Sequence, residues 1–64
     1  MKNDLTTFEK DLLKSINLCN GTNFTYKNFM EWSTDRNYLE QNLQEGEKMY
    51  EVFGCFVAIK NNEL

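Results

Sequence analysis

Residues 5–21 constrain the fold of this chain more than any other segment, because they specify an amphipathic helix together with both of its ends. Apolar residues recur there at spacings of three and four, which places them on one helical face: Leu5, Phe8, Leu12, Ile16 and Cys19. Thr6 and Glu9 form the Thr-x-x-Glu pattern of an N-terminal capping box. Gly21 tolerates the left-handed conformation that ends many helices. The pattern predicts a helix over residues 6–19.

The remaining residues must complete a small core around this helix. A chain of 64 residues forms one domain at most, spanning residues 1–64, and buries only roughly 60% of its unfolded surface. Aromatic residues are 14% of the chain, and each brings a large buried area. We therefore expect a folded single domain rather than a disordered chain.

The segment from residue 26 to residue 44 shows helical spacing that changes direction in the middle. One apolar group, formed by Tyr26, Phe29 and Met30, would face nearly opposite to a second group, formed by Tyr38, Leu39 and Leu43. Ser33 and Thr34 lie between the two groups and are typical N-cap residues. The pattern predicts two short helices, at 26–32 and 34–44, joined by a tight turn.

Residues 49–59 fit two structures. Their β-branched and aromatic content favours a strand, in which Gly54 would mark a bulge or a bend. Met49, Val52, Phe53, Phe56 and Ile59 also fit helical spacing. We interpret the segment as a strand, so that the predicted fold is α+β, with an all-α bundle as the alternative.

The predicted core combines the apolar faces of all these elements. It comprises Leu5, Phe8, Leu12, Ile16, Phe29, Trp32, Leu39, Leu43, Val52, Phe53, Phe56 and Ile59. We expect Trp32 near its centre, because a lone Trp in a small domain is usually part of the core. The two cysteines, Cys19 and Cys55, are expected as free thiols that behave as small core residues.

Several residue types that catalysis or cofactor binding needs are missing. The chain has no His, the commonest general base, and its three glycines are too far apart for a phosphate-binding loop. With no His and no close pair of cysteines, we expect no metal site. The sequence therefore predicts neither an enzyme nor a cofactor-binding protein, with no catalytic residues.

Acidic residues are concentrated between residues 31 and 51. Six carboxylates lie there against only Arg36 and Lys48: Glu31, Asp35, Glu40, Glu45, Glu47 and Glu51. They are either the solvated surface of short elements or a docking surface for the basic, nucleic-acid-binding groove of a host protein. In size and charge the chain resembles small acidic phage inhibitors, including many anti-CRISPR proteins. The resemblance implies a phage or mobile-element inhibitor, and the six carboxylates are the predicted partner-binding residues.

The order of predicted elements also resembles a winged helix-turn-helix, which would imply a DNA-binding regulator. Arg36, Asn37 and Gln41 would then meet base edges from a recognition helix. The helix is acidic, however, and the expected phosphate-neutralising patch is missing. Nucleic acid is therefore the less favoured partner.

Two further expectations concern location and self-association. The longest apolar run is too short to span a membrane and the first residues do not resemble an export signal, so we expect a cytoplasmic protein with no membrane contact. Residues 52–59 are apolar on both faces as a strand, which predicts a homodimer through this segment.

Overall fold

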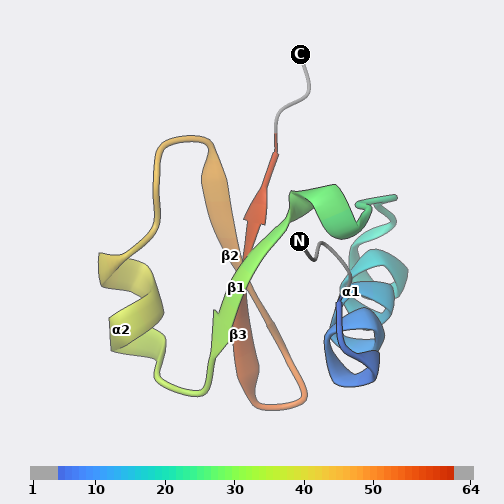
Figure 1. Cartoon of the computed structure of the whole chain (residues 1–64), viewed down its shortest axis with the longest axis horizontal. Helices are drawn as coiled ribbons and strands as arrows, with labels where there is room; N and C mark the ends of the chain where they lie inside the picture. The colour runs from blue at the N-terminus through green and yellow to red at the C-terminus, as the bar shows by residue number, and fades with distance from the viewer. Residues whose placement is uncertain (1–4, 62–64) are drawn as a thin grey trace.

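The computed structural model describes residues 5–61, which form two helices, a short 3₁₀ helix and three strands. In chain order they are α1 (Thr7–Asn20), η1 (Tyr26–Asn28), β1 (Phe29–Ser33), α2 (Arg36–Gln41), β2 (Glu47–Val52) and β3 (Cys55–Lys60). The strands form one antiparallel sheet in the order β1-β3-β2. The helices lie on opposite sides of this sheet (Figure 1). The fold is therefore α+β, as the sequence predicts.

Helix α1 confirms the first sequence prediction, including both ends. The Thr6 side chain accepts a hydrogen bond from the Glu9 N–H at 3.1 Å, and Glu9 accepts one from the Thr6 N–H at 2.9 Å. Gly21 ends the helix with φ 66°. Only the central part of the predicted face is buried, however. Phe8 and Cys19, which lie near the two ends of the helix, are exposed, and this corrects their assignment to the core.

The predicted helix over residues 26–32 is wrong. Thr25 caps a single 3₁₀ turn, and the chain then extends into β1. The apolar spacing of residues 26–32 is compatible with a helix, but pairing with β3 satisfies the backbone polar groups of both strands. The second predicted helix exists but is shorter, since α2 begins after Asp35 rather than Ser33 and ends at Gln41.

The C-terminal segment is a hairpin, which confirms the strand interpretation and corrects its details. It begins at Glu47, and Gly54 lies in the two-residue turn rather than at a bulge. Both turn residues have positive φ, 55° at Phe53 and 74° at Gly54, as a type I′ hairpin turn requires. Phe53 is 68% exposed, so its assignment to the core is wrong.

The main core lies between α1 and the sheet. Its buried residues are Leu12, Leu13, Ile16, Phe29, Cys55, Val57 and Ile59. Trp32 lies beside this cluster rather than at its centre, and its ring contacts that of Phe8 edge-to-face at 5.1 Å between centroids. Of the other predicted core residues, Leu39 is buried, while Leu5, Leu43, Val52 and Phe56 are only partly buried. Across residues 5–61, no helix has both the length and the apolar character needed to span a membrane.

Candidate functional site: the acidic α2 face

The strand register divides the sheet into two faces with different side chains. Cys55, Val57 and Ile59 of β3 point toward α1 and belong to the main core. Side chains alternate along a strand, so Phe56, Ala58 and Lys60 point toward α2. Their cross-strand partners share that face: Glu31 and Ser33 from β1, and Glu47, Met49 and Glu51 from β2. We call this side of the molecule, together with α2 and the turn after it, the α2 face.

Helix α2 is a short, polar cover for this face. The Asp35 side chain caps it by accepting a hydrogen bond from the Tyr38 N–H at 3.2 Å. Leu39 is 1% exposed and is the one residue of α2 that is buried. The Tyr38 hydroxyl donates a hydrogen bond of 2.8 Å to Oε2 of Glu31, which ties the helix to β1. This bond and the charge of Glu31 raise the pKa of Tyr38 above its ordinary value.

All six carboxylates predicted from the sequence lie on the α2 face, but they are not equally available to a partner. Glu31 and Asp35 accept the bonds described above, and Glu47 accepts one from the Gln44 N–H at 3.0 Å. Glu40 forms an exposed ion pair with Arg36 at 3.3 Å, which is worth little in water. Within residues 5–61, Glu45 and Glu51 are exposed and have neither a hydrogen bond nor an ion pair.

The two sides of the molecule also differ in charge balance. Among residues 5–61, the α2 face has six carboxylates against two cations, Arg36 and Lys60. The charges of α1 cancel, since Lys10 and Lys14 alternate with Glu9 and Asp11. Within the described part of the chain, negative charge is therefore concentrated on the side of α2.

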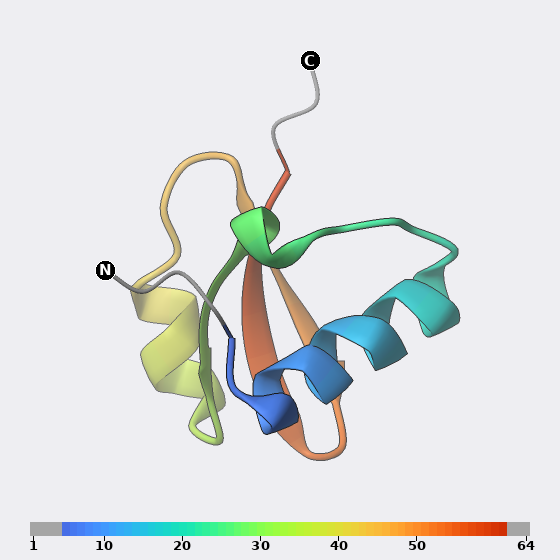
Figure 2. The ribbon, with the colours of Figure 1, turned by 45° about the vertical axis from the view of Figure 1, so that its right-hand side comes forward.

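Sequence reasoning missed the exposed tip of the β2–β3 hairpin. The first turn of α1, the β1–α2 connection and the Phe53–Gly54 turn lie at the same end of the molecule in both Figure 1 and Figure 2. A two-residue turn ending in Gly between two apolar runs is a known hairpin pattern, so Val52-Phe53-Gly54-Cys55 was the available indication. Strand β3 is the central strand, so the proposed dimer through residues 52–59 would depend on Phe53 rather than on an open strand edge.

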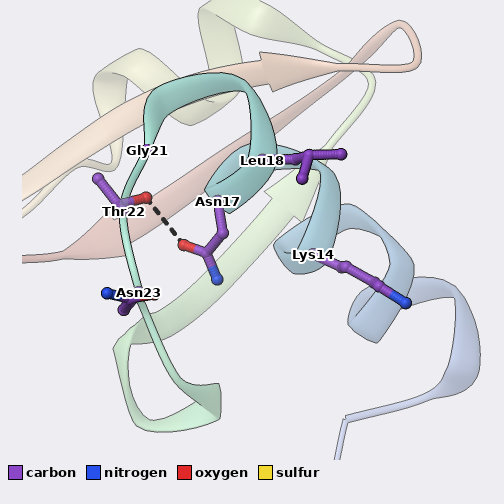
Figure 3. Close-up of a pocket in the computed structure, with 6 residues that line it drawn as sticks. All are labelled: Lys14, Asn17, Leu18, Gly21, Thr22 and Asn23. Carbon is purple, nitrogen blue, oxygen red and sulfur yellow. Dashed lines mark hydrogen bonds between the residues drawn. The ribbon is translucent and has the colours of Figure 1, made fainter.

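A shallow hollow at the end of α1 is lined by Lys14 and otherwise by uncharged residues (Figure 3). The Asn17 side chain organises the loop that follows the helix, because it accepts hydrogen bonds from the Thr22 hydroxyl at 2.8 Å and the Phe24 N–H at 2.9 Å. Its amide also donates to the Phe24 carbonyl at 3.0 Å. Lys14 extends away from these groups (Figure 3). Asn17 and Thr22, which line the hollow, therefore hold the loop in place.

Comparison with known proteins gives no match to a protein-family model, to a curated protein or to a solved structure.

Proposed function

We propose that this chain is a protein-binding domain that presents the α2 face to the basic, nucleic-acid-binding groove of a host protein in the cytoplasm. In this role it is a phage or mobile-element inhibitor of the anti-CRISPR kind. The observation that supports the proposal best is the gathering of six carboxylates, from two strands, one helix and one turn, on one side of a small domain.

The arrangement suits electrostatic recognition in two ways. Carboxylates held by a folded scaffold steer a positively charged partner and fix its orientation. They also occupy positions at which a basic groove would otherwise meet phosphates. Glu45 and Glu51 contribute most, because no internal bond within the described residues has to break before they contact a partner.

The experiment is a capture of host proteins on the immobilised chain, compared between two charge-reversed variants. Glu45→Lys combined with Glu51→Lys changes the α2 face at two exposed positions whose side chains form no hydrogen bond or ion pair within residues 5–61. Lys10→Glu combined with Lys14→Glu is the matched control on exposed positions of α1. We expect the first variant to lose the captured protein and the second to retain it. Heparin, a polyanion, should release the protein from the wild-type chain.

If the Lys10→Glu, Lys14→Glu variant lost the captured protein and the Glu45→Lys, Glu51→Lys variant kept it, the binding surface would lie on α1. Circular dichroism of both variants provides the folding control. Since all four substitutions are at exposed helix, turn or strand positions, each variant should remain folded.

DNA binding is the second candidate, and the terminal β2–β3 hairpin, which has the place of a wing, favours it. The helix-turn-helix itself is incomplete, because β1 occupies residues that were predicted as its first helix. The candidate recognition helix has six residues, and its Arg36 is paired with Glu40. A gel-shift assay at low salt separates the two functions. Specific retardation that is lost in Arg36→Ala would favour the regulator over the inhibitor.

Self-association is a separate proposal, made through Phe53 and the neighbouring turn. Sedimentation velocity at micromolar concentration measures it directly. A dimer that dissociates on Phe53→Asn would support contact through the hairpin tip, and a monomer at all concentrations would exclude it.

A further inference from the structure

The two edges of the sheet differ in how well they are protected from pairing with another strand. Strand β1 has five residues, and its register with β3 is interrupted between Phe29 and Glu31. Short strands and bulges are the usual protection of an exposed edge. Strand β2 pairs with β3 over six consecutive residues without any irregularity. Among residues 5–61 no other strand pairs with β2, so its outer edge is regular and open.

The hairpin turn determines which backbone groups of β2 face this open edge. In a two-residue hairpin the residues that flank the turn, here Val52 and Cys55, form a hydrogen-bonded pair. Hydrogen-bonded and non-hydrogen-bonded pairs alternate along the hairpin. At its far end the Asn61 N–H donates a hydrogen bond of 2.9 Å to the Gly46 carbonyl, as this alternation requires. Even-numbered residues of β2 therefore bond to β3. Odd-numbered residues direct their N–H and carbonyl groups outward.

The outward residues are Glu47, Met49 and Glu51. The N–H of Glu47 is already bonded to the Gln44 carbonyl at 3.0 Å. Within the described part of the chain, the N–H groups of Met49 and Glu51 have no acceptor outside the sheet ladder. Strand β2 thus presents two unbonded donors at alternate positions, which is the pattern an added strand needs.

The same three residues point their side chains to the α2 face. Helix α2 packs on β1 and β3. The strip of the α2 face that runs along β2, next to the open edge, is therefore not covered by this helix. On that strip Met49 lies between two carboxylates, Glu47 and Glu51, which are four residues apart. A strand added to the edge would place alternate side chains directly beside this acidic–apolar–acidic row.

We infer that the outer edge of β2 binds an extended segment of the partner by strand addition, and that this segment has a basic–x–apolar–x–basic pattern. The pattern is symmetric, so it suits a parallel or an antiparallel added strand. The inference rests on the proposed function for the basic character of the partner. A second copy of this chain is disfavoured in the symmetric register centred on Met49, because Glu47 would lie opposite Glu51 of the other copy.

The first test measures amide hydrogen exchange of the ¹⁵N-labelled full chain with a short capped peptide whose core is lysine–threonine–valine–threonine–lysine. Exchange at Met49 and Glu51 should slow at least about tenfold at saturation, while Tyr50, already bonded to β3, should change little. A peptide with glutamate in place of both lysines is the matched control and should give no protection. Glu51→Gln should weaken binding of the lysine peptide about two- to fivefold. Glu47→Gln should weaken it less, because Lys60 lies opposite Glu47.

The second test uses alternately N-methylated versions of the lysine peptide, which leave the protein unchanged. Methylation of the amides on one edge of the peptide should abolish binding, and methylation of the alternate amides should spare it. Equal affinities of the two methylated peptides would overturn strand addition.

Two other outcomes separate this inference from the proposed function. If the lysine peptide perturbs the α2 face but leaves exchange at Met49 and Glu51 unchanged, strand addition is wrong and the acidic docking surface stands. If exchange at both amides slows with concentration in the free chain, the edge binds a second copy and the inference is overturned.

Discussion

The two faces of the sheet differ in how completely a helix covers them. Helix α1 has 14 residues, is capped at both ends and covers one face with a continuous buried cluster. Helix α2 has six residues, and on its side Leu39 and Ala58 are the fully buried apolar residues among those described. Stability in this small domain therefore comes mainly from the α1 face. The α2 face is consequently free to hold charged groups that a core would exclude.

The most severe test of this comparison is truncation of one buried leucine on each face. Leu12→Ala should lower the free energy of unfolding by about 3 kcal/mol, whereas Leu39→Ala should lower it by about 2 kcal/mol, because a short helix relaxes more easily around a cavity. A domain of this size has only about 3–10 kcal/mol in total, so Leu12→Ala will lie near the limit of folding. Urea denaturation followed by circular dichroism measures both. A larger loss for Leu39→Ala would reverse the assignment of the two faces.

The helix caps allow a milder version of the same test. Thr6→Ala removes half of the capping box of α1 and should lower the free energy of unfolding by about 1 kcal/mol. Asp35→Ala removes the N-cap of α2, and we expect it to accelerate amide exchange in α2 with a smaller effect on global unfolding. Equal losses of global stability would mean that α2 is as strongly coupled to the core as α1.

At the hairpin tip we predict a gain in stability. A bulky side chain at φ 55° is strained by about 1 kcal/mol relative to a residue that tolerates the left-handed region. Phe53→Asn creates the preferred Asn-Gly turn sequence and should raise the free energy of unfolding by about that amount. Gly54→Ala is the control and should destabilise. A loss of stability in Phe53→Asn would show that the exposed ring makes contacts that compensate for its strain.

The smallest expected effect is the titration of Tyr38. Glu31 raises the pKa of Tyr38 in the folded state. The stability that the Tyr38–Glu31 interaction contributes is therefore present below the unfolded pKa of about 10, and it is lost as the pH rises through the folded pKa. Ultraviolet absorbance titration should show the Tyr38 pKa falling toward 10 in Glu31→Gln. An unchanged pKa in that variant would indicate that the Tyr38–Glu31 bond does not form in solution.

The sequence predicted the parts of the fold that local interactions determine. Thr6, Glu9 and Gly21 define α1 through contacts within a few residues, so the helix could be located without the rest of the structure. Strand β1 could not be located in this way. Phe29 and Trp32 fit a helix locally, and only pairing with Ile59 and Val57, far along the chain, makes them a strand.

The candidate site shows the same division. Acidic residues between 31 and 51 could be counted from the sequence, but their placement on one face depends on the register of three strands. Two features had no indication in the local sequence. One is that Glu31 and Glu47 accept hydrogen bonds from other residues of the chain. The other is that the backbone groups of Met49 and Glu51 point outward from the sheet edge.

Carbodiimide cross-linking of the chain to its captured partner shows which carboxylates contact that partner, because the reagent joins carboxylates to lysine amines beside them. Mass spectrometry of the products should find the partner linked through Glu45, Glu51 and Glu40, on the α2 face. Glu9 and Asp11 on α1 are the internal control and should remain unlinked. Cross-links confined to Glu9 and Asp11 would instead place the partner on α1 and exclude the α2 face as its binding surface.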